Sequence, residues 1–264
     1  MAGRLAGKVA IVTGAAPRGE GIGNGSAIAI LFAREGAKVA LVNRSMERAE
    51  GLKKTIEAEG GECMACAADV SKTKDVQRMV DSVVERYGKL DVLVNNVGMG
   101  LGGTAETVSE DAWDKTFERN LKTALLCSKY SIPQMKKQGG GSIINISTFA
   151  AIKGIRREGG LVAYTASKAG LHGMSLAMAA DFAADRIRSN VIVVGSVWTP
   201  LSAAIQKNHG PEFRTERLKA IPLGIEGTGW DVGWAAVYLA SDESRWVTGA
   251  SIPVEGGVLS IMQG

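Results

Sequence analysis

The hydrophobic positions of this chain follow two patterns that alternate from one end to the other. Short runs rich in valine and isoleucine predict strands that are covered on both faces of a sheet. These runs are Val9–Val12, Lys38–Val42, Glu62–Ala67, Val92–Asn95, Ser142–Ile146, Asn190–Val194 and Ser251–Val254. Between them, apolar residues recur at helical spacing in Ser26–Glu35, Met46–Glu59, Lys72–Tyr87, Glu110–Lys137, Ala163–Ala184 and Asp231–Ser241. This alternation predicts right-handed crossovers and an α/β fold, with a doubly wound, mostly parallel sheet of seven strands and helices on both faces.

Two segments interrupt the alternation. Lys153–Gly160 reads as a loop with two arginines and three glycines, and Trp198–Gly229 reads as a long irregular stretch before the last helix. In an open α/β sheet, such segments lie beyond the carboxyl ends of the strands, where ligands bind. We expect them to form the walls and lid of a substrate pocket. No linker or repeat divides the chain, so residues 1–264 are interpreted as one domain in which residues 198–229 cover the substrate.

The composition argues against several classes of partner. Hydrophobic residues make up 45% and charged residues 22% of the 264 positions, as in ordinary globular proteins. The net charge is +4 with no block of lysine and arginine, so nucleic-acid binding has no support. No apolar run approaches the length of a membrane span, and the first strand begins too early to leave room for a signal peptide. We therefore expect a cytoplasmic protein with no nucleic-acid or membrane partner.

The cysteines and histidines do not predict a metal site. Cys63 and Cys66 have the spacing of a redox or zinc pair. On a strand, however, residues three apart point to opposite faces, so we interpret both as small apolar residues. His172 and His209 have no third ligand candidate beside them.

A glycine-rich turn between the first strand and the first helix predicts a dinucleotide site. Glycines there let the backbone turn tightly and let a pyrophosphate approach the helix N-terminus, whose N–H groups favour negative charge. A glycine cluster alone is weak evidence, but this position in a strand–turn–helix unit strengthens it. The residues predicted to bind the cofactor in this turn are Gly14, Arg18, Gly21, Ile22, Gly23 and Asn24.

The ends of the next strands predict the rest of the cofactor site. After the second strand come Asn43 and Arg44, where an acidic residue would bind the 2′-hydroxyl of NAD. The amide does not repel a phosphate and the arginine pairs well with one, so NADP(H) is favoured and NAD(H) remains possible. A solvent-facing arginine is the alternative interpretation of Arg44. Further along, the predicted cofactor contacts are Asp69 and Val70 near the adenine, and Asn96, Val97 and Gly98 at the crevice of the sheet.

Tyr164 and Lys168 are four residues apart on a predicted helix, so their side chains share one face. The ammonium, together with a positive nicotinamide, is expected to lower the pKa of the phenol. A tyrosine tuned in this way gives a proton to a ketone oxygen that receives a hydride, or takes one from an alcohol. The pair therefore predicts carbonyl/alcohol redox chemistry.

The order of these motifs along the chain resembles the short-chain dehydrogenase/reductase family, whose fold is Rossmann-like. The resemblance rests on Thr13-Gly14, Asn95-Asn96-Val97-Gly98, Asn120, Asn145-Ile146-Ser147-Thr148, Tyr164-x-x-x-Lys168 and Glu255-Gly256-Gly257. It implies that Tyr164 is the acid/base, that Lys168 lowers its pKa and binds the nicotinamide ribose, and that Asn120 anchors a proton relay. It places Thr148 at the position of the catalytic hydroxyl, with Ser147 beside it as the alternative.

The same resemblance extends to the cofactor, the substrate and the assembly. It implies that Val197 and Thr199 meet the carboxamide and phosphates of the cofactor, and that the chain forms dimers or tetramers through its fourth and fifth crossover helices. The candidate pocket residues are Met99, Phe149, Trp198 and Leu201. Their apolar character indicates a bulky hydrophobic substrate, although such residues equally fill protein cores.

Taken together, the motifs predict an NAD(P)-dependent oxidoreductase that transfers a hydride between a nicotinamide cofactor and a ketone or secondary alcohol. NADPH-dependent carbonyl reduction is the favoured direction. The alternatives are an NAD-linked alcohol dehydrogenase and, with less support, a protein that senses nicotinamide redox state without turnover. Arg156 and Arg157 would suit an acidic substrate, but exposed arginines on a loop usually recognise nothing.

Overall fold

The computed structural model describes residues 3–17, 19–210 and 212–261, without the side chains of residues 207–209. Within these ranges, one parallel sheet has the strand order β3-β2-β1-β4-β5-β6-β7. Its strands are β1 (Val9–Thr13), β2 (Lys38–Asn43), β3 (Cys63–Ala67), β4 (Val92–Asn95), β5 (Gly141–Thr148), β6 (Ile187–Val194) and β7 (Ser251–Val254). The predicted doubly wound α/β fold is therefore confirmed. The order reverses between β1 and β4, which opens a crevice at their carboxyl ends.

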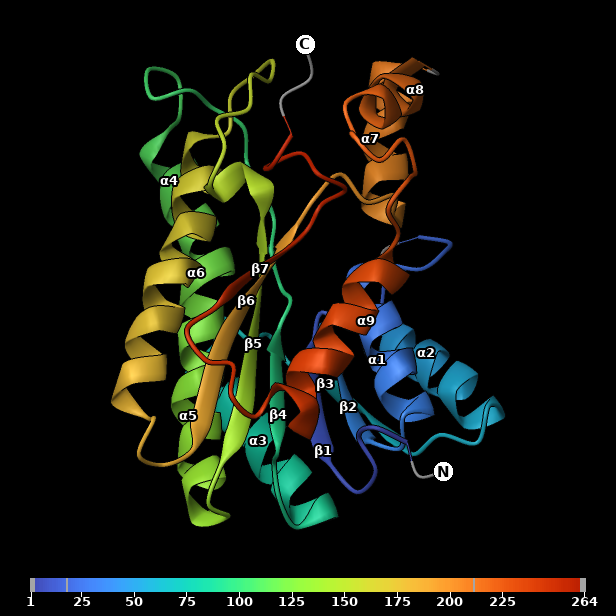
Figure 1. Cartoon of the computed structure of the whole chain (residues 1–264), viewed down its shortest axis with the longest axis vertical. Helices are drawn as coiled ribbons and strands as arrows, with labels where there is room; N and C mark the ends of the chain where they lie inside the picture. The colour runs from blue at the N-terminus through green and yellow to red at the C-terminus, as the bar shows by residue number, and fades with distance from the viewer. Residues whose placement is uncertain (1–2, 18, 211, 262–264) are drawn as a thin grey trace.

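Helices cover both faces of this sheet (Figure 1). One layer consists of α1 (Asn24–Arg34), α2 (Met46–Ala58) and α9 (Gly229–Ala240), and the other of α3 (Thr73–Tyr87), α5 (Thr123–Lys137) and α6 (Val162–Asp181). Two short 3₁₀ turns, η2 (Phe149–Ala151) and η3 (Asp242–Ser244), follow β5 and α9.

Each face of the sheet has its own hydrophobic core, because successive side chains of a strand point to opposite faces. In β1, Val12 packs in the core under α1 and α9, whereas Ile11 packs in the core under α3 and α5. The two cysteines of β3 divide in the same way. Cys63 lies in the first core and Cys66 packs against the second, and both are free thiols. This confirms that the Cys63–Cys66 spacing is not a bonded pair, and burial raises the pKa of Cys63 to about 11.

The segment Glu110–Lys137, predicted as one helix, is divided in the structure. It consists of α4 (Glu110–Phe117), a π-helical turn η1 (Glu118–Lys122) and then α5. A π turn inserts an extra residue and changes which face the following side chains present. Here it carries the buried Asn120. The apolar spacing of the sequence contains no signal for this break.

The prediction that Trp198–Gly229 is irregular was wrong, because the segment contains α7 (Pro200–His209) and α8 (Glu212–Lys219). A helix start was present in the sequence, since Thr199 caps α7 and Pro200 occupies its first turn. Helix α8 is exposed and strongly charged, so no apolar periodicity marks it. The two ends of the segment are joined by a backbone hydrogen bond, in which the Trp198 N–H donates to the Gly227 carbonyl at 2.7 Å.

The predicted loop at residues 153–160 does lie at the same end of the molecule as α7 and α8 (Figure 1). This end is the one to which the carboxyl ends of the strands point. Of the helices the structure describes, none is long and apolar enough to cross a membrane.

Candidate active site

The turn after β1 is held in place by the end of β4. The Thr13 hydroxyl donates to the Val94 carbonyl at 3.0 Å and accepts from the Asn96 N–H at 3.0 Å. The Asn96 amide in turn donates to the carbonyls of Thr13 and Gly14, both at 3.1 Å. A Cβ at Gly25 would lie 2.3 Å from the Gly14 carbonyl oxygen, so only glycine lets α1 approach this closely. These hydrogen bonds and this close contact fix the first turn of the predicted cofactor site.

The N-terminus of α1 is shaped to receive a polar ligand. Gly23 is its N-cap, and the buried Oδ1 of Asn24 has no partner among the described residues. The more distant glycines, Gly19 and Gly21, face Pro200 at the start of α7, which would lie 3.9 and 3.7 Å from added Cβ atoms. Ile22 packs against the core beneath. Arg18 lies outside the described residues, so its predicted contact is not tested.

At the end of β2, the two candidate residues behave differently. The amide of Asn43 donates to the Ala16 carbonyl at 2.9 Å and accepts from the Ser45 N–H at 3.0 Å, so it joins the glycine turn to β2. Arg44 is exposed and makes no ion pair with any residue that the structure describes. The side chain of Arg44 therefore remains available to a ligand.

Asp69 lies close enough to Arg44 for their charges to interact. Burial by itself would raise the pKa of Asp69, but hydrogen bonds from the N–H and hydroxyl of Ser71, at 3.0 and 2.8 Å, and the charges of Arg44 and Lys72 lower it overall. The carboxylate is thus ionised at neutral pH and already oriented. Val70, the next predicted contact, is buried.

Tyr164 lies in the first turn of α6, beside the end of β5. Burial raises the pKa of its phenol, while a hydrogen bond with the Thr148 hydroxyl and the charge of Arg157 act in the opposite direction. Burial is the largest of these causes. The expectation that Lys168, together with a positive nicotinamide, lowers the phenol pKa stays a prediction.

Lys168 is buried with only 4% of its surface exposed. Its Nζ donates to the Ile146 carbonyl at 2.8 Å, and burial lowers its pKa to about 8. A Cβ at Gly98 would lie 2.8 Å from this Nζ. Glycine at position 98 therefore allows the lysine to reach the crevice.

The two hydroxyl candidates on β5 point in different directions. Thr148 bonds to Tyr164 and accepts from the Ala150 N–H at 3.3 Å. Ser147 points to the opposite face, where its hydroxyl donates to the Lys168 carbonyl at 3.1 Å and lies 3.0 Å from Nε2 of His172. The structure therefore brings Thr148, and not Ser147, to the tyrosine.

His172 belongs to a bridge that connects α6 to two strands of the sheet. Its Nδ1 lies 2.9 Å from the Ser251 hydroxyl of β7, while Nε2 reaches Ser147 of β5. Because the Ser147 proton is used at the Lys168 carbonyl, this pattern assigns the ring proton to Nε2. Burial lowers the pKa of His172, which keeps the ring neutral. We name this set (Ser147, His172 and Ser251) the histidine bridge.

Asn120 joins the π turn to the end of β4. Its amide nitrogen donates to the Met99 carbonyl at 2.9 Å and to the Ser167 hydroxyl at 2.8 Å, and its oxygen accepts from the Met99 N–H at 2.8 Å. A Cβ at Gly98 would lie 3.4 Å from that oxygen. The π turn thus places the asparagine at the lysine side of the crevice.

The four predicted pocket residues differ in exposure. Met99 is half-buried and its sulfur contacts the guanidinium of Arg119, and Phe149 is half-buried at the start of η2. The ring of Trp198 is covered by the guanidinium of Arg214 at 4.4 Å. Leu201 is 65% exposed on α7. These residues do not form one closed apolar pocket.

The two predicted cofactor contacts after β6 have structural roles of their own. Val197 is buried and its carbonyl accepts from the Ser202 hydroxyl at 3.0 Å, while the Thr199 hydroxyl accepts from the Ser202 N–H at 3.3 Å. Both residues therefore fix the start of α7 at the end of β6. Among the described residues, no three His, Cys, Asp or Glu side chains gather where they could hold a metal ion.

The strand order, the glycine turn and the Tyr164–Thr148 pair define a dinucleotide-binding α/β oxidoreductase as the class of protein that this chain resembles. Comparison with known proteins gives the family. A family profile described as enoyl-(acyl carrier protein) reductase matches residues 14–259. The chain belongs to the short-chain dehydrogenase/reductase family, whose members are oxidoreductases that use nicotinamide cofactors.

Individual relatives cover nearly the whole chain. A 2,5-dichloro-2,5-cyclohexadiene-1,4-diol dehydrogenase of Sphingobium indicum is 37% identical over 257 residues, which is 97% of this chain and 98% of the relative. A 3-oxoacyl-[acyl-carrier-protein] reductase of Thermotoga maritima is 36% identical over 256 residues, covering 97% and 99%. A crystal structure described as a short-chain dehydrogenase/reductase from Burkholderia xenovorans matches with a TM-score of 0.92 at 40% identity, covering 99% of this chain and 100% of that one. The relatives include both a dehydrogenase and a reductase, so they support oxidoreduction without naming a substrate.

Proposed function

We propose that this protein reduces a ketone to a secondary alcohol with NADPH. The observation that carries the proposal is the placement of the Thr148 hydroxyl where it lowers the pKa of Tyr164, beside the buried Lys168 and at the crevice that the glycine turn opens. When bound, the nicotinamide supplies the hydride that reduces the carbonyl carbon. Tyr164 gives its proton to the carbonyl oxygen, and Thr148 donates a hydrogen bond to the same oxygen as negative charge develops on it.

The raised pKa of Tyr164 supports the reductive direction. A phenol with a raised pKa is fully protonated at neutral pH, which is the form that protonates a ketone oxygen. Alcohol oxidation would need the phenolate, which burial disfavours. Reduction is therefore expected to dominate at neutral pH, and oxidation to increase toward alkaline pH.

Lys168 and Asn120 are proposed to return the proton to Tyr164. The lysine ammonium has a pKa of about 8, so it holds a proton at neutral pH that it releases easily. Asn120 is fixed by its bonds to Met99 and Ser167 on the same side of the crevice. We propose that Val197, Thr199 and the turn residues from Gly14 to Asn24 hold the dinucleotide, and that residues 198–229 cover the substrate.

Preference for NADPH is supported by the end of β2. The Asn43 amide is uncharged and occupied by backbone contacts, so it does not repel a 2′-phosphate, whereas the exposed Arg44 is positioned to pair with one. The diol dehydrogenase among the relatives favours alcohol oxidation, and we keep an NAD-linked alcohol dehydrogenase as the second candidate function.

A titration with NADPH and NADH separates these candidates. Wild type is expected to bind NADPH more tightly, and Arg44→Ala is expected to weaken NADPH binding about tenfold while NADH binding stays unchanged. The neighbouring Arg48→Ala serves as a control for general loss of positive charge on α2. Equal NADH and NADPH binding in wild type would instead support the NAD-linked dehydrogenase.

Tyr164→Phe tests whether the protein is an enzyme. This change is expected to lower kcat by about 10²–10⁴-fold because it removes the acid, while cofactor binding stays intact. Tyr130→Phe, on α5, is the matched control and should retain activity. If wild type binds NADPH but turns over no carbonyl compound or alcohol, and Tyr164→Phe is indistinguishable from it, the protein is a nicotinamide-sensing module.

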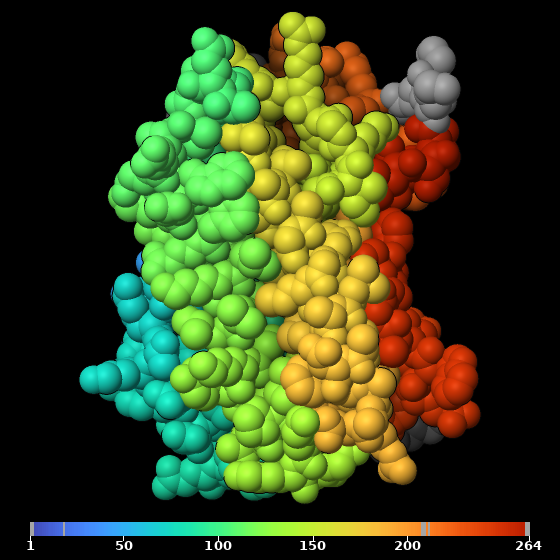
Figure 2. Space-filling model, turned by 90° about the vertical axis from the view of Figure 1, so that its left-hand side faces the viewer, coloured from blue at the N-terminus to red at the C-terminus, as the bar shows by residue number. Residues whose placement is uncertain are grey.

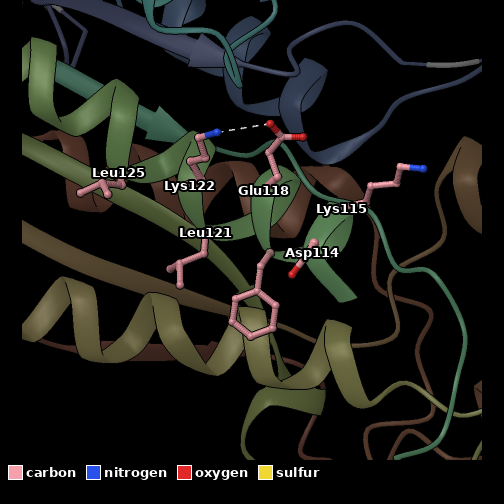
Figure 3. Close-up of a pocket in the computed structure, with 7 residues that line it drawn as sticks. Asp114, Lys115, Glu118, Leu121, Lys122 and Leu125 are labelled. Carbon is pink, nitrogen blue, oxygen red and sulfur yellow. Dashed lines mark hydrogen bonds and ion pairs between the residues drawn. The ribbon is translucent and has the colours of Figure 1, made fainter. Parts of the chain in front are cut away.

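We also propose that the chain forms a homo-oligomer through the outer surface of α4, α5 and α6, the face shown in Figure 2. A groove of about 580 Å³ on this face is lined by Asp114, Lys115, Phe117, Glu118, Leu121, Lys122 and Leu125 (Figure 3). Leu125 is 51% exposed and Leu176 of α6 is 58% exposed, so apolar surface continues across both helices. Analytical ultracentrifugation is expected to show a dimer or tetramer that Leu125→Asp dissociates.

A further inference from the structure

We propose that the substrate of this enzyme carries an anionic group, a carboxylate or a phosphate, which Arg157 and Arg217 hold beside Tyr164. The inference rests on the proposed carbonyl reduction and adds the chemical class of the substrate. Two guanidinium groups from different segments carry it, one from the loop at residues 153–160 and one from α8.

Arg217 reaches from α8 to the end of β6. Its Nη2 donates to the Val197 carbonyl at 3.2 Å, and its guanidinium lies 5.3 Å from the centre of the Phe213 ring. The side chain is half-buried, and burial is the main cause that lowers its pKa. A half-buried guanidinium would normally be paired with a carboxylate.

No described carboxylate pairs with Arg217. The acid whose charge acts on it is Glu226, and both oxygens of Glu226 are bound by Arg214, one of them at 2.8 Å from Nε. Arg217 thus has its two contacts, with a carbonyl and a ring, but no neutralising partner in the part of the chain that the structure describes.

Arg157 lies on the exposed loop at residues 153–160, and its charge acts on the same region. The end of its loop is fixed to the segment after β4, because the Gly103 N–H donates to the Gly159 carbonyl at 2.5 Å and the Val162 N–H donates to the Gly103 carbonyl at 3.1 Å. The charge of Arg157 lowers the pKa of Tyr164 and also the pKa of Arg217. Arg157 therefore lies near both the phenol and the second guanidinium, and it makes no ion pair with a described residue.

Two unpaired guanidinium groups whose charges act on one another repel, and the half-burial of Arg217 reduces the screening by water. An anion between them would remove both costs, and the fork of an arginine side chain matches the oxygens of a carboxylate or phosphate. Because Arg157 also acts on Tyr164, an anion bound there would belong to the molecule whose carbonyl reaches the phenol. Arg157 thus differs from an ordinary exposed arginine because its charge acts on both Tyr164 and Arg217.

Matched pairs of charged and neutral ketones test this proposal. The probes are a series of oxo acids of increasing chain length, from levulinate upward, each with its methyl ester, and dihydroxyacetone phosphate with dihydroxyacetone. The quantity measured is the ratio of kcat/KM for the charged compound to kcat/KM for its neutral partner, in wild type, Arg157→Gln and Arg217→Gln. This ratio does not depend on the fraction of folded enzyme, nor on a change in the pKa of Tyr164, because both act equally on the two members of a pair.

The expected result is a ratio of at least about tenfold in wild type, which falls toward one in each arginine variant, since charge-assisted hydrogen bonds discriminate by roughly this factor. Arg156→Gln, a neighbour on the same loop whose charge acts on neither Tyr164 nor Arg217, is the control and should retain the ratio. A high ratio for the oxo acids identifies a carboxylate, and one for the phosphate pair identifies a phosphate.

Two other outcomes would overturn the proposal in different ways. Ratios near one in wild type, or ratios that the arginine variants do not change, would reject the anionic substrate while leaving carbonyl reduction intact. Absence of turnover for every probe and for neutral ketones and alcohols, with Tyr164→Phe identical to wild type, would reject the proposed function and the anionic substrate with it.

Discussion

The two sides of the crevice are built in different ways. On the cofactor side, Thr13, Asn96 and Asn43 connect the glycine turn to β4 and β2 through hydrogen bonds to backbone atoms. On the substrate side, α7, α8 and the loop at residues 153–160 are largely exposed, and α8 has no buried residue. The side proposed to bind the cofactor is therefore preformed by the fold, whereas the side proposed to bind the substrate is a set of surface segments whose side chains can change at little cost to stability.

The largest expected effect concerns Thr148 and Ser147, two neighbouring residues of β5 at the boundary between the two sides. Thr148→Val should lower kcat by about 10²–10³-fold, because it removes the donor to the developing oxyanion. Ser147→Ala should leave kcat within a few-fold and lower the free energy of unfolding by about 1–2 kcal/mol, because it leaves Nε2 of His172 without its partner. Steady-state kinetics and urea unfolding of both variants measure the difference. Equal kinetic loss in the two variants would contradict the assignment of Thr148.

A second prediction concerns the cost of burying Lys168. Its pKa falls from 10.5 in the unfolded chain to about 8 in the folded protein, so between these pH values the unfolded state binds more protons and stability rises with pH. Below the folded pKa the ammonium carries its full burial penalty, on the order of 3 kcal/mol. Lys168→Met should therefore be inactive yet more stable than wild type at pH 7 by about 2 kcal/mol, after the lost bond to Ile146 is subtracted.

Urea unfolding across the pH range checks this prediction. The advantage of Lys168→Met should shrink as pH rises from 8 toward 10.5, because wild type is then relieved of its buried charge. Lys129→Met, at an exposed position on α5, should show no such dependence. A Lys168→Met variant that is less stable than wild type at pH 7 would show that the ammonium stabilises the fold.

The smallest expected effects compare the two sides directly. Gly25→Ala forces a Cβ to within 2.3 Å of the Gly14 carbonyl oxygen, so it should lower the free energy of unfolding by about 1–3 kcal/mol and weaken NADPH binding. Leu201→Ser, on the exposed surface of α7, should change stability by no more than about 0.5 kcal/mol and act on KM alone. Thermal unfolding measures the change in stability of the two variants, and cofactor titration measures their NADPH binding. Comparable destabilisation by both would mean that the substrate side is as integral to the fold as the cofactor side.

The sequence predicted the strands on the side proposed for the cofactor but not the helices α7 and α8 on the side proposed for the substrate, for physical reasons. Strands such as β1 and β4 are buried on both faces, so they appear in the sequence as continuous apolar runs. These runs allowed the strands of the sheet to be predicted. Helix α8 is exposed and charged, so no burial pattern marks it. The π turn at Glu118–Lys122 is only five residues long, and the apolar positions of Glu110–Lys137 were interpreted as one continuous helix.

At the candidate site, the sequence predicted that Tyr164 and Lys168 share one face of a helix, but not what surrounds them. In the structure the ammonium bonds to the Ile146 carbonyl, and burial raises the phenol pKa. Neighbouring hydroxyls such as Ser147 and Thr148 are equivalent until the strand places them on opposite faces. Arg217 was missed altogether, because nothing in a charged surface helix signals that one of its arginines turns inward.

The histidine bridge has a consequence for how the enzyme matures. His172 lies on the helix that carries Tyr164 and Lys168, yet one of its two anchors, Ser251, belongs to the last strand of the sheet. During synthesis the ribosome releases this strand after Tyr164, Lys168 and His172 have already emerged. The helix therefore acquires this attachment only when β7 joins the sheet, and not while α6 folds.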